Sequence, residues 1–282
     1  MEILETHIVP AIPEKVRLQE YAHLVFKSLP TRTAVKKAIK REEIRINKKV
    51  AGTGDWIEQG QEITLIKQES KPTKVFQLKL EIILEDEFLA VINKPAGIPT
   101  SGNYFRTVEN ALLFNLNPSS QLDALPQPRP VHRLDNPTSG LLIIAKTRTA
   151  QTILSRDLQN KTIRKTYLAL VHGSIAGNTV YTDDLDGKPA HTEIQLLKHL
   201  QIAHKDFSLV EASPATGRTH QIRKHLSLNG NAIVGDKEYG TIVSAGFSNG
   251  LYLAAIALDF THPILKTAVS LTLPWPLKFR RL

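Results

Sequence analysis

A short N-terminal region of the chain carries apolar side chains at helical spacing. Leu18, Tyr21, Ala22 and Val25 share one face of a predicted helix, which ends at Pro30. The rest of this region is predicted as an extended leader over residues 1–16, a second helix capped by Thr31, a strand at 44–46, a turn at 52–60 and a strand at 61–66.

From residue 75 onward the pattern changes to short apolar runs typical of strands. Strands are predicted at 78–84, 89–93, 140–146, 166–171, 192–197, 207–212, 251–260 and 268–273, and helices at 107–116, 149–159 and 219–228. So many strands with so few crossover helices argue against a doubly wound parallel sheet. We therefore predict an α+β fold with a mixed, largely antiparallel β-sheet and flanking helices.

A polar stretch separates the two regions. Residues 67–74, KQESKPTK, have no periodicity and contain a proline, which is typical of a linker. The predicted organisation is a small α+β domain with its leader over residues 1–66, a linker at 67–75 and a catalytic domain at 76–282.

The chain has 282 residues and a formal net charge of +9, which favours a polyanionic partner. Basic residues crowd the second predicted helix and the strand after it, opposed only by Glu42 and Glu43: Arg32, Lys36, Lys37, Lys40, Arg41 and Arg45. A solvated helix face would also explain them, but this crowding favours a face that binds phosphates.

Composition limits the other classes of function. The chain has no cysteine, so disulfides and thiolate metal sites are excluded. Its first residues lack the basic start and apolar core of a signal peptide, and no apolar run approaches membrane-spanning length. We expect a soluble, cytoplasmic protein.

Asp135 is the first candidate for chemistry. It precedes an unbroken apolar run at 140–145, predicted as a buried strand, and a carboxylate beside such a strand is costly unless it is paired. An alternative is an Asp-Asn-Pro turn whose carboxylate only caps a loop. On the residues alone the two interpretations stay open.

A second polar segment, residues 216–226, could supply the partner. It holds Arg218, His220 and Arg223 on or before a predicted helix, and Arg223 is the natural counter-charge for Asp135. Tyr167 stands alone in an apolar strand, where core packing is the usual explanation. The acidic residues 183–187 do not have the spacing of a calcium loop, and no metal site is predicted.

The motifs HRLDNPTSGLLIIAK, KTYLALVHG, PATGRTHQIRKHL, GDKEYG and NKPAGIPTSG occur in the order found in the RluA family of RNA pseudouridine synthases. The resemblance spans roughly residues 76–282 and implies a mixed β-sheet fold with a central cleft. It implies that Asp135 is the catalytic aspartate, that Tyr167 lies against the uracil, and that Arg223 pairs with Asp135. It further implies that Arg133 and His132 fill the space left by the extruded nucleotide, that Arg218 and His220 bind RNA, and that Lys94 is structural and lines the cleft.

The N-terminal region resembles the small RNA-binding αL domain first named for a small-subunit ribosomal protein. The resemblance rests on Arg17-Leu18, Thr31-Arg32, residues 44–47 and a closing Gly-Gln-Glu-Ile. Glu43 and Lys48 stand where this domain usually has glycine, which puts the turn geometry in question.

Together the two resemblances imply an RNA pseudouridine synthase. Its substrate would be uridines of structured RNA, with ribosomal RNA favoured and transfer RNA as the alternative. It would need no cofactor, nucleotide or metal, and we expect a monomer. Two alternatives remain: a catalytically inactive RNA-binding or RNA-folding protein, and a glycoside-cleaving enzyme, which would need a second carboxylate across the bond.

Overall fold

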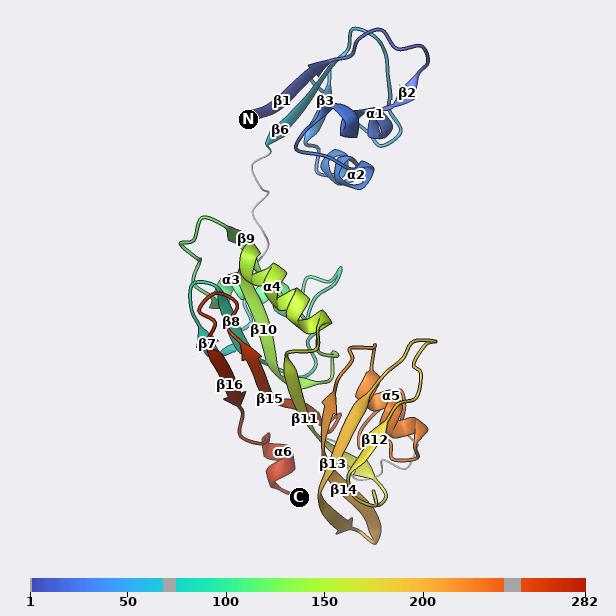
Figure 1. Ribbon diagram of the computed structural model, residues 1–282, viewed down its shortest axis with the longest axis vertical. Helices are drawn as coiled ribbons and strands as arrows, with labels where there is room; N and C mark the ends of the chain where they lie inside the picture. The colour runs from blue at the N-terminus through green and yellow to red at the C-terminus, as the bar shows by residue number, and fades with distance from the viewer. Residues whose placement is uncertain (1, 68–74, 241–249) are drawn as a thin grey trace. The chain divides into compact units, whose positions relative to one another are not determined.

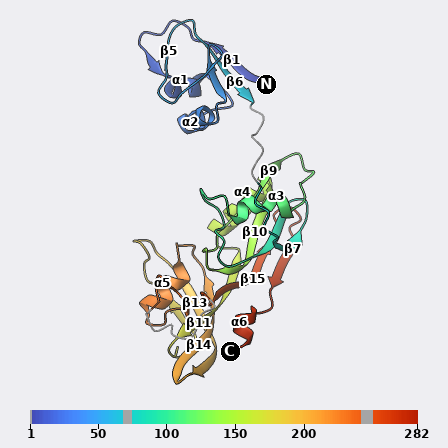
Figure 2. The same cartoon turned by 180° about the vertical axis from the view of Figure 1, so that it is seen from behind.

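The structure is a computed structural model that describes residues 2–67, 75–240 and 250–282. The chain forms two compact units, Met1–Thr73 and Lys74–Leu282, each with its own hydrophobic core (Figures 1 and 2). Of the predicted linker at 67–75, residues 68–74 lie outside the described residues.

Among its described residues, the smaller unit packs two helices against a sheet with strand order β1-β6-β3-β4. Its elements are β1 (Glu2–Ile8), β2 (Val16–Arg17), α1 (Leu18–Val25), α2 (Arg32–Lys40), β3 (Ile44–Ile46), β4 (Lys49–Val50), β5 (Trp56–Ile57) and β6 (Glu62–Lys67). Thr31 caps α2 as predicted, because its hydroxyl accepts the Ala34 N–H at 3.1 Å.

The prediction of an extended leader over residues 1–16 was wrong for its first half. This segment forms β1, which pairs antiparallel with β6 at the edge of the sheet. Most side chains of β1 are exposed, so the apolar alternation that marks a half-buried strand is weak there. The predicted turn at 52–60 also contains β5, which pairs with β2.

The larger unit is built on one extended sheet with strand order β12-β13-β14-β11-β15-β10-β8-β7; β16 pairs with β15, and β9 pairs with β10. Its strands are β7 (Glu81–Glu85), β8 (Leu89–Lys94), β9 (Ala124–Pro130), β10 (Ser139–Thr147), β11 (Arg164–His172), β12 (Thr179–Tyr181), β13 (Thr192–Ile202), β14 (Lys205–Pro214), β15 (Leu253–Thr261) and β16 (Ala268–Thr272). Its helices are α3 (Val108–Asn115), α4 (Arg148–Gln159), α5 (Gln221–Leu228) and α6 (Leu277–Arg280). Within the described part of the sheet, only β10 and β15 run parallel, so the predicted α+β class with a mixed, largely antiparallel sheet is confirmed.

The sheet is covered on both faces around β10, and this explains its unbroken apolar run. Leu142 and Ile144 join the core that includes α3, whereas Leu141 and Ile143 join the core that includes α4. Alternating side chains of a strand point to opposite faces. A strand buried on both faces therefore needs apolar residues at every position.

Gly140 fixes where β10 meets β15. Its φ is +117°, and a Cβ at this position would lie 2.1 Å from the carbonyl oxygen of Ala255. Only glycine allows this approach. The strand that follows Asp135 is thereby held against the centre of the sheet.

Sequence patterns missed β9 because Pro126, Pro128 and Pro130 interrupt it. Among the described residues β9 pairs with β10 only, which is the edge position where a strand tolerates proline.

In the described ranges, no helix is both long and apolar enough to span a membrane.

Candidate active site

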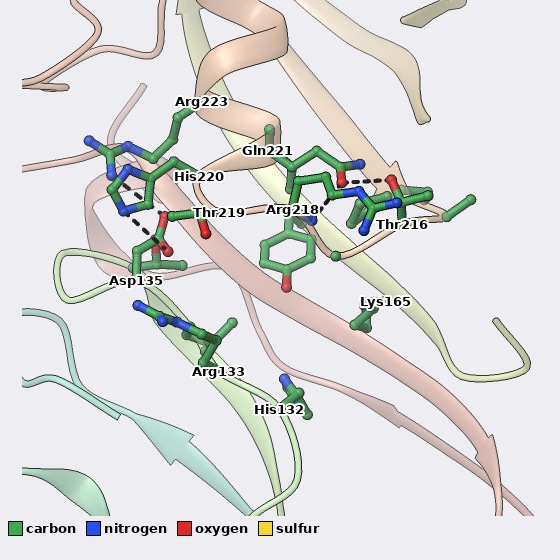
Figure 3. Close-up of a pocket in the computed structure, with 18 of the residues that line it drawn as sticks. His132, Arg133, Asp135, Lys165, Thr216, Arg218, Thr219, His220, Gln221 and Arg223 are labelled. Carbon is green, nitrogen blue, oxygen red and sulfur yellow. Dashed lines mark hydrogen bonds and ion pairs between the residues drawn. The ribbon is translucent and has the colours of Figure 1, made fainter. Parts of the chain in front are cut away.

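A cleft of about 460 Å³ lies in the larger unit (Figure 3). Its walls come from the loop between β9 and β10, from the start of β11, and from residues 213–223, which lead from β14 into α5. Segments far apart in sequence therefore meet here, and they include every residue predicted to act within the catalytic domain: His132, Arg133, Asp135, Tyr167, Arg218, His220 and Arg223.

Hydrogen bonds from Lys94 and Gly97 hold the loop that carries Asp135. The buried ammonium of Lys94 donates to the carbonyl oxygens of Thr138 at 2.8 Å and Asn136 at 3.3 Å, and Gly97 N–H donates to Asn136 O at 2.8 Å. Lys94 also donates to Pro95 O at 2.8 Å. Lys94 thus has a structural role, because its hydrogen bonds hold the Asp135 loop. The prediction that Lys94 lines the cleft was wrong. Burial lowers the pKa of Lys94 to about 8, although the nearby Asp135 acts in the opposite direction.

The structure brings Asp135 and Arg223 together. Asp135 Oδ2 lies 3.5 Å from Arg223 Nη1, and Asp135 Oδ1 lies 3.8 Å from His220 Nε2. The Asp135 side chain is 17% exposed and the Arg223 side chain 5%. At 3.5 Å the pair attracts without forming a tight hydrogen bond, so the carboxylate oxygens remain open toward the cleft.

Arg223 makes its closest bonds with residues of the GDKEYG segment, residues 235–240, to which no role was assigned from the sequence. Its Nε and Nη2 donate to the two oxygens of Asp236 at 2.7 and 2.8 Å, and Nη2 also reaches Glu238 at 3.1 Å. The Asp236 side chain is fully buried. Although burial acts in the opposite direction, the hydrogen bond from Arg223 lowers the pKa of Asp236, and Asp236 in turn raises the pKa of Arg223.

The role of Asp236 was missed, and its one signal in the sequence is that Gly235 and Gly240 bound its segment. The structure explains these glycines, because a Cβ at Gly235 or Gly240 would come within 2.1 or 2.2 Å of a backbone oxygen. An acid in such a tightly packed loop is a candidate partner for a buried arginine. Nothing in the sequence alone links it to Arg223.

His220 is held from two sides. Its backbone is in the left-handed region, with φ +55°, directly before α5 begins at Gln221. Nδ1 lies 3.0 Å from Tyr239 Oη and 3.4 Å from Glu238 Oε1, which leaves Nε2 facing Asp135.

Tyr167 lies on β11 and is 8% exposed. The register of β11 against β15 shifts between Thr166 and Tyr167, where Ile256 of β15 is the extra residue. Burial and the negative charge of Asp135 raise the pKa of the Tyr167 phenol, so it is neutral at pH 7.

His132 and Arg133 differ in their surroundings. His132 Nε2 accepts the Ile143 N–H at 3.2 Å, and burial together with the charge of Lys165 lowers its pKa to about 3. The ring is therefore neutral and partly committed to β10. Arg133 is exposed, and Figure 3 shows it on the opposite side of Asp135 from His220 and Arg223.

Gln221 organises the remaining wall and was not predicted. Its Oε1 accepts from the Thr216 hydroxyl at 2.7 Å and from Arg218 N–H at 3.0 Å, and its Nε2 donates to His191 O and Thr192 Oγ1, both at 2.9 Å. Arg218 Nε donates to Pro189 O at 3.0 Å. The segment before α5 is thus tied to β13.

The basic residues of the smaller unit lie on α2 and β3, apart from its core. Arg32, Lys36, Lys37, Lys40 and Arg41 are exposed, and Arg45 is partly buried. Arg41 pairs with Glu43 at 2.8 Å and Arg32 with Glu20 at 3.5 Å. The face of α2 that carries Val35, Ala38 and Ile39 packs inward.

No cluster of His, Asp and Glu side chains that could hold a metal ion occurs in residues 2–67, 75–240 or 250–282. In the acidic segment 183–187, both oxygens of Asp186 accept from Lys224 Nζ, at 2.7 and 2.8 Å.

Comparison with known proteins places this cleft in a family. A family model described as RNA pseudouridylate synthase matches residues 88–228. An uncharacterized RNA pseudouridine synthase of Bacillus subtilis, YlyB, is 33% identical over 266 residues, which are 87% of this chain and 86% of that protein. The ribosomal large subunit pseudouridine synthase C of Pasteurella multocida is 36% identical over 234 residues, which are 74% of this chain and 68% of that protein.

Solved structures agree with the fold. Human RNA pseudouridylate synthase domain containing 1 aligns with a TM-score of 0.57 and 25% identity over 74% of this chain and 87% of that chain. The matched region, residues 88–228, contains Asp135, Tyr167 and Arg223. The chain therefore belongs to the RNA pseudouridylate synthase family, whose members are isomerases that act on RNA.

Proposed function

We propose that this pseudouridine synthase modifies uridines of large-subunit ribosomal RNA, with Asp135 as its catalytic residue. The observation that carries the proposal is the Asp135 carboxylate, which lines the cleft 3.5 Å from the buried Arg223. Relatives named ribosomal large subunit pseudouridine synthases support this class of RNA over transfer RNA.

The chemistry needs one carboxylate and no redox partner. The N1–C1′ bond of uridine breaks, the uracil turns, and C5 bonds to C1′; C5 then loses its proton and N1 gains one. Asp135 acts on the ribose, either by attack on C1′ or by removal of the 2′ proton. Arg223 Nη1 lies 3.5 Å from one oxygen of this carboxylate and does not bind both of them.

Tyr167 lies against the uracil in this proposal. Because the phenol is neutral at pH 7, its ring offers a stacking surface, and its hydroxyl can accept the C5 proton only while releasing its own. Arg133, with His132 beside it, occupies the space that the extruded nucleotide leaves, which offsets part of the cost of unstacking, a few kcal/mol. Arg218 and His220 contact the RNA from the opposite wall.

The smaller unit is proposed as an RNA-binding domain of the αL kind, within residues 1–66, joined by a linker at 67–75 to the catalytic domain at 76–282. The exposed cations of α2 support this role, because phosphate contacts supply affinity without sequence preference. We also propose a cytoplasmic enzyme that acts as a monomer without a nucleotide cofactor.

The test is a map of pseudouridines in ribosomal and transfer RNA from cells that have the gene, lack it, or carry Asp135→Asn. We expect specific ribosomal positions to lose the modification without the gene, and Asp135→Asn not to restore it while still binding RNA. Loss confined to transfer RNA would overturn the choice of substrate. An Asp135→Asn protein that restores the modification would overturn the role of Asp135, and a wild type that modifies no RNA would favour a protein that only binds or folds RNA.

A further inference from the structure

Among the described residues of the larger unit, every buried or partly buried lysine except Lys165 has a hydrogen-bond acceptor. Lys94 donates to three carbonyl oxygens, Lys146 pairs with Glu85 at 2.8 Å, Lys224 pairs with Asp186, and Lys278 donates to Leu251 O. Lys165 is partly buried on β11, and among the described residues it has neither a carboxylate nor a hydrogen-bond acceptor within bonding distance.

A cation in this position is costly to the folded protein. Burial lowers the pKa of Lys165, which means that the site destabilises the charged form. Proteins rarely keep such a charge without a partner, and a ligand can supply the partner that the protein lacks.

The surroundings of Lys165 indicate an anionic ligand. Lys165 and Tyr167 are two residues apart on β11, so both point to the same face, and both line the cleft. Figure 3 shows Lys165 near His132, at a distance from Arg223. The cleft is lined by six Lys and Arg residues but only two acids, Asp135 and Glu193, and Glu193 is exposed and 3.6 Å from His191.

We propose that Lys165 binds a backbone phosphate of the RNA beside the uridine that enters the cleft, flanked by Lys161 and Arg164. The inference rests on the proposed function, because it requires that RNA enters this cleft. Two residues along a strand span about 7 Å, close to the separation between a base and the phosphates of its own nucleotide. The contact positions the strand but reads no base, so it would serve any sequence around the target.

The test compares wild type, Lys165→Gln, Lys165→Arg and Lys198→Gln on a large-subunit ribosomal RNA transcript made with uridine tritiated at C5. Lys198 is an exposed lysine of β13 that does not line the cleft. Tritium release gives kcat and KM, and filter binding of the same transcript gives Kd over a series of KCl concentrations.

We expect Lys165→Gln to raise KM and Kd about tenfold, with a smaller change in kcat, and to reduce the slope of log Kd against log salt by about 0.7. Lys165→Arg should restore most of the affinity, and Lys198→Gln should behave as wild type. Lys165→Gln should also keep or raise the Tm, because it removes an unpaired charge, whereas Lys94→Gln should lower it.

Three results would overturn the assignment. One is a Lys165→Gln protein with the Kd and salt slope of Lys198→Gln. Another is a fall in kcat at unchanged KM, which would place Lys165 on the base. The third is a fall in Tm like that of Lys94→Gln, which would make Lys165 structural. Absence of tritium release by wild type would count against the proposed function instead, and the binding measurements would still decide the phosphate contact.

Discussion

Arg223 interacts with three carboxylates, those of Asp135, Asp236 and Glu238, and it binds Asp135 less closely than the other two. Two hydrogen bonds of 2.7 and 2.8 Å fix the guanidinium on Asp236, and the Tyr239 ring lies 4.8 Å from its central carbon. Asp135 Oδ2 lies 3.5 Å from Nη1 of the same guanidinium, too far for a short hydrogen bond. In the proposed reaction, a carboxylate bound by two short hydrogen bonds would first have to break them, whereas Asp135 has no such bonds to Arg223.

Asp236→Asn tests this arrangement. Loss of the buried charge leaves Arg223 without its anchor, so we expect the free energy of unfolding to fall by about 3 kcal/mol at pH 7. We also expect kcat to fall, because the freed guanidinium can clamp Asp135. Urea denaturation and tritium release measure the two effects. A variant with wild-type stability and kcat would contradict the role of Asp236 as the anchor.

The stability effect should depend on pH in a defined direction. The pKa of Asp236 is lowered in the folded protein, while the unfolded chain keeps a value of about 3.9. The stabilisation is therefore complete well above pH 4 and is lost as pH falls through the folded-state pKa. The Tm difference between wild type and Asp236→Asn should be large at pH 7 and small near pH 2, and a constant difference would argue against the ion pair as its source.

At the level of elements, β10 is the support of the site. Its first residues pair with β15 and its later residues with β8 and β9, so the Asp135 loop enters the sheet at a point held on several sides. The apolar run predicted this strand well. Its parallel partner was not predictable, because the pairing depends on Gly140 meeting a residue more than a hundred positions away.

Gly140→Ala should disrupt this junction. The added Cβ would lie 2.1 Å from Ala255 O, so a backbone must shift, and we expect a loss of at least about 3 kcal/mol in unfolding free energy together with loss of turnover. Gly177→Ala is the matched control, because Gly177 also has a positive φ, +130°, but a Cβ there would meet nothing within 4 Å. Comparable Tm losses in the two variants would show that backbone strain, and not the junction, is responsible.

At the level of the whole molecule, the two units have separate cores and carry different kinds of positive charge. The cations of α2 are exposed on the smaller unit, whereas those of the larger unit line the cleft that contains Asp135. This division suits an enzyme that gains affinity in one unit and performs chemistry in the other.

The triple variant Lys36→Gln, Lys37→Gln and Lys40→Gln tests the division. We expect a rise in Kd for the ribosomal RNA transcript of at least about tenfold at 0.1 M salt and a shallower salt dependence, with kcat at saturating RNA near that of wild type. Filter binding and tritium release measure the two quantities, and Lys198→Gln is again the control. A fall in kcat with unchanged Kd would contradict the proposed role of α2.

The sequence by itself determined the local elements and the candidate residues for the reaction. Periodicity predicted β10 and α4, Thr31 predicted the start of α2, and the motif around Asp135 indicated both the family and a partner in Arg223. These features depend on neighbours along the chain or on motifs that stay contiguous, so a linear pattern can carry them.

Only the tertiary structure decided the network around those residues. Four features depend on which distant segments pack together: the bonds of Asp236 to Arg223, those of Lys94 to the Asp135 loop, those of Gln221 to Arg218, and the lack of an acceptor for Lys165 among the described residues. Hydrogen bonds and burial act through space, and a charge is costly or useful only according to what surrounds it. No spacing along the chain contains that information, so these roles emerge only from the fold.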